Sequence, residues 1–396
     1  MRRLLPFVCV VIVVDTMLYA ALTPLLPHFR REFDLSKGGV GVLAAAFAVG
    51  VFLAAVPGGI FASRFGSRAA VIGGLALVTL ASVGVAFADN FGLLFGARFV
   101  QGVGSSMTWA GALSWLALAT PSERRGRTMG TAIGAAVFGA LLGPVIGAGA
   151  SAIGVRAAFS TVAGVCVVLI ALVFWFEPPP PERQPARAIL GAFRNSEFLR
   201  GLWVTTLPAL LFGTLIVLAT LALDGHGFSA AEIGAVWIVA TGIESAINPV
   251  LGRITDRLGP MAPIRVALVG SIVCSIGLAL TENPWVLVPL VLVAAIAFGG
   301  FYAPGMTMLS HAAEGMGLAQ ALSFGVMNAA WAIGNAVGPA AGGGLAQLTR
   351  DAVPYLVCAG LCAVTLATFR VGLRRAGARP GSPRPRPSSA DTPPSG

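Results

Sequence analysis

The chain contains 396 residues, of which 56% are hydrophobic and 11% are charged, and its mean hydropathy is +0.86. Soluble domains carry about 25% charged residues, so this composition excludes a soluble enzyme or a soluble binding module. The formal net charge of +10 would suit nucleic-acid binding, but the positions of the basic residues, given below, argue against that function.

Twelve apolar stretches follow one another along the chain. A helix of about 20 apolar residues crosses the ~30 Å hydrocarbon core of a bilayer, which is longer than a buried core helix needs to be. Each stretch is therefore predicted to be a transmembrane helix. The stretches are 5–27, 38–62, 69–88, 92–118, 128–152, 156–176, 199–223, 230–252, 262–281, 285–310, 318–345 and 351–373.

Two spacing patterns occur twice, at offsets of 195 and 193 positions, which indicates a duplicated chain. With six spans in each copy, we predict an all-α membrane protein whose twelve transmembrane helices form two six-helix pseudo-symmetric halves around a central cavity. The first pattern comprises Gly130, Gly139, Gly143, Pro144 and Gly147, repeated as Gly325, Gly334, Gly338, Pro339 and Gly342. The second comprises Ser36, Gly41, Gly59, Arg64 and Gly66, repeated as Ser229, Gly234, Gly252, Arg257 and Gly259.

The predicted halves are residues 1–176 and 199–373. The segment 177–198 between them opens with four consecutive prolines, which cannot continue a helix and favour an extended cytoplasmic linker. The last segment, 374–396, is rich in Pro, Ser and Arg and is predicted to be a disordered cytoplasmic tail.

The basic residues are distributed unequally between the two sides of this topology. If the N-terminus is cytoplasmic, cytoplasmic segments carry twenty of the 26 basic residues and Arg98 lies inside a span. Only five lie on the opposite side, namely Arg30, Arg31, Lys37, Arg156 and Arg350. This is the positive-inside pattern, so we expect both termini in the cytoplasm, a multi-pass protein of the plasma (inner) membrane, and no nucleic-acid partner.

Asp15 lies near the middle of the first span, 11 residues after Leu4 and about 16 Å along the helix. Tyr19 follows at i+4 on the same face. A carboxylate in hydrocarbon is costly as an anion, so a proton and an organic cation can compete to neutralise it. This predicts a cation or proton site. The alternative is a structural Asp that bonds to hydroxyls of a neighbouring helix.

Arg98 lies within span four, and Gln101 follows one turn later on the same face. An arginine inside an apolar run costs roughly 2.5–3.5 kcal/mol on insertion scales, so it should face the bundle interior and have a partner there. The alternative is snorkelling to the outer interface, because Asp89 and Asn90 mark that edge.

The repeated glycine–proline patterns fall in spans five and eleven. Glycines at i, i+4 and i+8 form a smooth strip that permits close packing, and Pro144 and Pro339 should kink their helices. We interpret the two helices as a pliable, tightly packed seam at which the halves rock. Ordinary small-residue packing is the alternative.

Glu244 is a second acid in the membrane, in span eight, with Asn248 at i+4. It is a candidate proton carrier of the second half, or part of a polar face that packs by hydrogen bonds. Trp109, Trp115 and Trp331 would suit an adaptable site for apolar cations, although such side chains more often only pack between helices.

These residues together resemble the major facilitator superfamily, in particular its twelve-span drug:proton antiporter branch, over residues 1 to about 373. The span-five pattern is similar to that branch's antiporter motif, and residues 98–104 resemble its R-x-x-Q-G-x-G motif. Residues 15–27 resemble the first span of drug:proton antiporters and vesicular monoamine transporters. The resemblance implies that Asp15 meets the proton or a cationic substrate and that Arg98 tunes a nearby carboxylate electrostatically.

Two loops resemble the family's gating loops. The loop after span two departs from the family's G-x-x-x-D-R-x-G-R-R/K pattern because Ser63 replaces the acid, whereas the loop after span eight keeps Asp256 beside Arg257. The resemblance implies that such acid–arginine pairs latch the closed cytoplasmic side, so Asp256 and Arg257 should dominate. The alternative is that the arginines only enforce orientation. The expected gating set is Gly59, Arg64, Gly66, Arg68, Gly252, Asp256, Arg257 and Gly259.

We therefore predict a monomeric secondary active transporter that exports a small amphipathic or cationic compound in exchange for protons by alternating access. Its partners would be the substrate, protons and the bilayer, with the proton gradient as energy source and no cofactor or metal. One alternative is a uniporter, symporter or exporter of a metabolite such as a sugar or an amino acid on the same fold, and a remoter one is a non-transporting membrane sensor or scaffold. The sequence contains no nucleophile triad, phosphate loop or metal-ligand set, so an enzyme is not predicted.

Overall fold

The computed structural model describes residues 3–177, 193–316 and 320–377. These residues form helices joined by short connections, and no strand occurs among them. The predicted linker 177–198 and tail 374–396 lie largely outside the described residues. The helices of the first half are α1 (Leu4–Ala20), the 3-10 turn η1 (Thr23–Leu25), α2 (Leu26–Glu32), α3 (Lys37–Phe65), α4 (Ser67–Ala86), α5 (Phe91–Ala119), α6 (Ser122–Ile153) and α7 (Val155–Val173). Those of the second half are α9 (Ser196–Gly225), α10 (Ala230–Leu258), α11 (Met261–Leu280), α12 (Pro284–Gly299), α13 (Tyr302–Gly315), α14 (Gln320–Leu348) and α15 (Ala352–Gly377).

The helices of the described part account for the twelve predicted spans. Ten segments are long and apolar enough to cross a membrane, and two of them, Leu4–Glu32 and Pro284–Leu309, each combine shorter helices. The remaining two spans are α5 and α14, with 29 residues each. Several helix ends lie beyond the predicted boundaries, since the first span continues through α2 to Glu32, α6 begins at Ser122 and α10 ends at Leu258. Charged residues at these ends extend the helices beyond the apolar stretches.

Equivalent residues of the two sequence repeats occupy equivalent places. Ser36 and Ser229 are the N-caps of α3 and α10, and each side chain accepts a hydrogen bond from the backbone N–H three residues later. Gly66 and Gly259 end the same helices with φ values of 90° and 75°, which favour glycine. The duplication seen in the sequence is therefore a duplication of structure.

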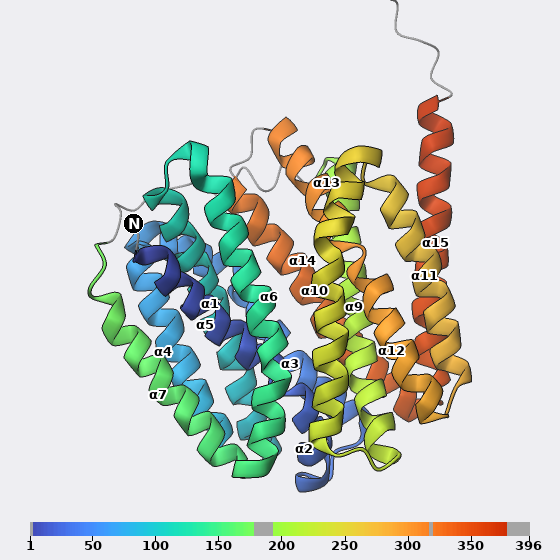
Figure 1. Cartoon of the computed structure of the whole chain (residues 1–396), viewed down its shortest axis with the longest axis horizontal. Coiled ribbons are helices and arrows are strands. Elements are labelled where there is room, and N and C mark those ends of the chain that lie inside the picture. The colour runs from blue at the N-terminus through green and yellow to red at the C-terminus, as the bar shows by residue number, and fades with distance from the viewer. Residues whose placement is uncertain (1–2, 178–192, 317–319, 378–396) are drawn as a thin grey trace, which may run out of the picture.

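The two halves lie side by side, with the blue-to-green helices on one side and the yellow-to-red helices on the other (Figure 1). Within the first half, α1 packs on α6 and α3 on α5, and within the second half α9 packs on α14 and α11 on α15. The most extensive contacts between the halves are those of α3 with α14 and of α6 with α10. The chain begins at one end of the bundle, here called the Gly66 end, and α2 lies at the other, the Asp34 end (Figure 1).

Pseudo-symmetric glycine–proline contacts form the junction between the halves. A Cβ atom on Gly41 of α3 would overlap the Pro339 carbonyl of α14, and one on Gly234 of α10 would lie 3.2 Å from the Pro144 carbonyl of α6. Gly41 and Gly234 are one repeated pair, and Pro339 and Pro144 are another. The absence of side chains at these glycines lets the backbones of the two halves approach closely.

Candidate functional site

Asp15 on α1 is buried, with 4% of its surface exposed. Its Oδ2 atom accepts hydrogen bonds from Ser105 Oγ at 2.6 Å and from Trp109 Nε1 at 2.9 Å, both on α5. Both donors are neutral, and Asp15 forms no ion pair with any described residue. The structure therefore places the carboxylate inside the first half, away from lipid, in a site that leaves its charge uncompensated.

Arg98 is buried on the same face of α5, with 2% of its surface exposed, which excludes snorkelling. Its guanidinium donates to the backbone carbonyls of Leu18 and Tyr19, each at 3.3 Å, and to Gln101 Oε1 at 2.5 Å. Its described partners thus include no carboxylate. The ring of Phe47 lies 5.2 Å from the guanidinium carbon.

The partners of Arg98 follow from the break in the first span. α1 ends at Ala20, and the prolines at 24 and 27 lie in the turn and short helix that follow. The last carbonyls of a helix lack internal partners, and the helix dipole makes that end negative. Arg98 supplies hydrogen bonds and positive charge to this end inside the membrane, and so stabilises the break.

Tyr19 connects the two halves. Its hydroxyl donates to Asn335 Oδ1 of α14 at 2.8 Å, and Asn335 is 5% exposed. Its ring packs against Phe47 of α3 and Trp331 of α14, with centroids 5.0 and 5.3 Å away. Tyr19, one helical turn after Asp15, therefore links the first half to the second.

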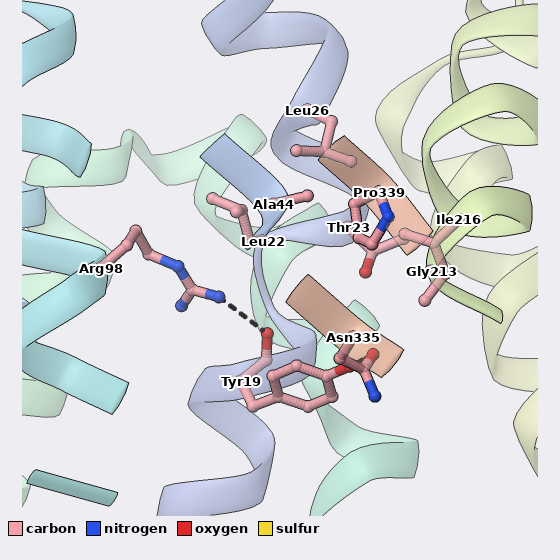
Figure 2. A pocket seen from close by; sticks show the side chains of 10 residues that line it. All are labelled: Tyr19, Leu22, Thr23, Leu26, Ala44, Arg98, Gly213, Ile216, Asn335 and Pro339. Carbon is pink, nitrogen blue, oxygen red and sulfur yellow. Dashed lines mark hydrogen bonds between the residues drawn. The ribbon is translucent and has the colours of Figure 1, made fainter. Parts of the chain in front are cut away.

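A small cavity of about 30 Å³ lies between the halves beside Tyr19. Figure 2 shows its lining, with Arg98 and Tyr19 on one side and Asn335, Pro339 and Gly213 on the other, and it shows the bond from Arg98 to the Tyr19 carbonyl. The volume suits one or two water molecules rather than a larger compound. This cavity lies at the closed junction of the halves.

Glu244 on α10 is partly buried and forms no hydrogen bond or ion pair with a described residue. Its side chain packs on α12, where a Cβ atom on Gly299 would lie 3.0 Å from Glu244 Oε1. Asn248, one turn later, is also partly buried. The second acid is thus an unpaired carboxylate in the second half.

The repeated glycines of α6 and α14 pack within their own halves, although both helices also contact the other half. Cβ atoms on the α6 glycines would overlap residues of α1 or of the turn that follows it, and those on the α14 glycines would overlap α9 residues. It is the neighbouring face of each helix, with Pro144 or Pro339, that contacts the other half. The glycines concerned are Gly139, Gly143 and Gly147 in α6, and Gly334, Gly338 and Gly342 in α14, whereas Gly130 and Gly325 have open space around them.

The predicted gating residues lie at the Gly66 end, and those whose side chains are described form no ion pair there. Arg64 and Arg257 are exposed and form no ion pair with a described residue, and the side chain of Asp256 lies outside the described part. Arg68 donates to the Phe174 carbonyl at 3.1 Å and so caps α7 of its own half. The glycines of this set, Gly59, Gly66, Gly252 and Gly259, all have open space where a Cβ would be.

At the Asp34 end, by contrast, charged residues join the halves. Arg31 of α2 pairs with Asp224 of α9 at 2.7 Å, and Lys37 of α3 pairs with Asp351 before α15 at 2.5 Å. The Gly38 N–H also donates to Gln347 Oε1 of α14 at 3.0 Å. Among the described side chains, the ion pairs between the halves are confined to this end.

Sequence reasoning missed Ser105 and Asn335, and it named Trp109 without assigning it to Asp15. Ser105 follows Arg98 by seven positions and Trp109 by eleven, so helical periodicity could have placed both on the Arg98 face. No local sequence pattern indicated Asn335 or the ion pairs between the halves. The described residues also contain no cluster of three or more His, Cys, Asp or Glu side chains that could hold a metal ion.

Comparisons with known proteins agree with this architecture. A sequence model of the Major Facilitator Superfamily matches residues 8–324. The chain is 21% identical to multidrug resistance protein 2 of Bacillus subtilis (strain 168), over 82% of this chain and 84% of that protein. It is 23% identical to quinolone resistance protein NorA of Staphylococcus aureus (strain MSSA476), over 84% of this chain and 87% of that protein.

A shorter match falls on part of the chain. It is 30% identical to a probable vesicular acetylcholine transporter-B of Danio rerio, over 46% of this chain and only 40% of that protein's length. Among solved structures, a bacterial homologue of the human lysosomal transporter Spinster, inward-facing and unoccupied, superposes with a TM-score of 0.78 and 15% identity, over 96% of this chain and 98% of that one. The xylose transporter XylE of E. coli gives a TM-score of 0.72 and 14% identity, over 93% and 99% of the two chains.

Proposed function

Because this chain belongs to the major facilitator superfamily, it is a multi-pass membrane transporter of small molecules and not an enzyme, and we propose that it exports a small amphipathic or cationic compound in exchange for protons. The plasma (inner) membrane is the proposed location, with both termini in the cytoplasm. We propose that the protein acts as a monomer and that the proton gradient drives the exchange without a cofactor.

The observation that carries the proposal is the environment of Asp15. A buried carboxylate bonded only to Ser105 and Trp109 retains an uncompensated charge in a low-dielectric site. Binding a proton or an organic cation removes that cost, and the two compete for the same group. Such competition is the thermodynamic basis of exchange, because each occupant displaces the other.

The arrangement of the halves supports alternating access. We propose that residues 1–176 and 199–373 move as two units about the glycine–proline contacts. The ion pairs hold the Asp34 end together, while Arg64 and Arg257 at the Gly66 end form no ion pair with a described side chain. This asymmetry fits a state open toward the Gly66 end, the proposed cytoplasmic side, from which an exporter loads its substrate.

Two observations favour drug-like cations over the alternative of a metabolite. Relatives that match more than four fifths of the chain are named for resistance to drugs, whereas the likeness to the xylose transporter concerns the fold alone. A sugar also carries no charge with which to displace a proton from Asp15. A sensor or scaffold role gains no support from any described residue.

Transport in liposomes tests the proposal. The purified chain, with ethidium as the probe cation and a trapped pH indicator, should exchange protons for ethidium. Asp15→Asn should abolish this coupled exchange while the protein remains folded and inserted. Asp34→Asn is the matched control, because Asp34 is exposed in a loop with φ of 48°, a conformation that asparagine adopts readily. Unchanged exchange by Asp15→Asn would remove Asp15 from the mechanism.

A further inference from the structure

One face of α5 carries a row of polar side chains that contact α1. Arg98 and Gln101 lie at the end where α1 breaks, and Ser105 and Trp109 lie one and two turns further along, at Asp15. Ser105 is 4% exposed and Trp109 is partly buried. The row brings two neutral donors to a single carboxylate oxygen.

We propose that Ser105 and Trp109 are positioning residues that fix the Asp15 carboxylate and leave its Oδ1 atom as the oxygen that exchanges proton and cation. The inference rests on the proposed function. Both donors bind Oδ2, at 2.6 and 2.9 Å, and no described residue donates to Oδ1.

The two donors restrict the carboxylate in different ways. The Ser105 hydroxyl can rotate about its Cβ–Oγ bond, but the indole N–H of Trp109 has a fixed direction within a bulky ring. Together they define the carboxylate plane, because two bonds to one oxygen from one helix leave little freedom for rotation. Oδ1 is then presented to its occupant in one orientation, without reorganisation at each cycle.

Few other charged or titratable groups face Asp15 in the described part of the chain. Cys166 of α7 interacts with it electrostatically. Arg98 of α5 binds the next turn of α1, and α6 presents Gly139 and Gly143 rather than polar side chains. Tyr19 lies one turn on, with Glu244 beyond it. The two α5 donors are therefore the hydrogen-bond partners that the described residues offer to the charged form of Asp15.

Infrared titration of the carboxyl groups tests the inference without a substrate. The protonated carboxyl band that disappears in Asp15→Asn is followed against pH in the lipid-reconstituted full chain. Hydrogen bonds to a carboxylate favour its charged form, so Trp109→Phe and Ser105→Ala should each move the half-titration of this band upward by about one pH unit. Ser105→Thr, which keeps a hydroxyl, should restore the original value.

The same helix offers matched controls. Trp115→Phe makes the same substitution at a buried tryptophan whose Nε1 has no partner, and Ser106→Ala removes a buried hydroxyl that is bonded to no described residue. Neither should move the titration. The inference would be overturned if the Trp109 and Ser105 variants titrated at the same pH as the parent chain. It would also be overturned if the control variants shifted the titration as much as these two variants do.

The outcomes also separate this inference from the proposed function. If Asp15→Asn abolishes ethidium–proton exchange but the α5 variants titrate as the parent chain does, only the positioning role fails. If the band shifts as expected but Asp15→Asn still exchanges, the geometry stands and the exchange function fails.

Discussion

Arg31 and Asp224 occupy equivalent positions in the two halves, 193 residues apart, and form an ion pair across the pseudo-symmetry axis with Arg31 Nη1 2.7 and 2.8 Å from the two carboxylate oxygens. The offset equals that of the sequence repeat containing Ser36 and Ser229. Identical residues at such positions would repel or leave each other unpaired. Opposite charges instead make the meeting point of the halves attractive.

This ion pair should favour the state closed at the Asp34 end. Arg31→Asp places two acids together, and since exposed pairs contribute about 0–1 kcal/mol, repulsion in their place should raise the open population several-fold. Labelling of Thr23→Cys, which lines the cavity, by a membrane-impermeant maleimide added from that side should increase accordingly.

A double variant in which the two charges are exchanged provides the control. Arg31→Asp combined with Asp224→Arg should return labelling to the level of the parent chain. Arg30→Asp, an adjacent charge change at a residue without an ion pair, should leave labelling unchanged. Labelling that rises equally in all three variants would show a general effect of charge rather than of the pair.

Alanine in the glycine strips should destabilise each half internally. A Cβ atom at Gly139 would overlap the Val13 carbonyl of α1, and one at Gly338 would overlap the Leu210 carbonyl of α9. Separating two packed backbones costs about 1–3 kcal/mol, so Gly139→Ala and Gly338→Ala should lower the thermal unfolding midpoint in detergent. Gly130→Ala and Gly325→Ala belong to the same motifs but meet no neighbouring atom, and they should not lower it.

Arg98→Lys should be strongly destabilising despite conserving the charge. A lysine ammonium cannot reproduce the planar fork that joins the Leu18 and Tyr19 carbonyls to Gln101. Loss of hydrogen bonds to a charged group should cost about 1.5–3 kcal/mol, measured by thermal unfolding, with a parallel loss of exchange. The matched variant Arg64→Lys changes an exposed side chain and should unfold like the parent chain. Equal stability of both variants would contradict the capping role.

Glu244→Gln should change coupling rather than stability. The carboxylate has no described hydrogen-bond partner, so the amide loses no bond on replacement, while its proton-carrying capacity disappears. We expect fewer protons exchanged per ethidium in liposomes, with unchanged thermal unfolding. Glu282→Gln, at an exposed position, provides the comparison. An unaltered ratio for Glu244→Gln would assign this acid to packing alone.

The sequence predicted the parts of the site that depend on depth and helix face. Asp15 and Arg98 were predicted to lie inside the bundle, and both are buried, because a charge in an apolar stretch must turn away from lipid. The break after Ala20 follows from the prolines near it. A smooth glycine face indicates close packing but not which neighbour it meets, and the structure places both strips against helices of their own half.

The sequence by itself determined the twelve helices and their division into two halves, because span length, repeat offset and helical period can be read along the chain. Only the tertiary structure decided the partners: Ser105 and Trp109 for Asp15, two carbonyls for Arg98, Asn335 for Tyr19 and Asp224 for Arg31. These partners lie between 79 and 316 positions away. Which of them meet depends on the rotation and tilt of whole helices, and these are set by packing summed over many side chains.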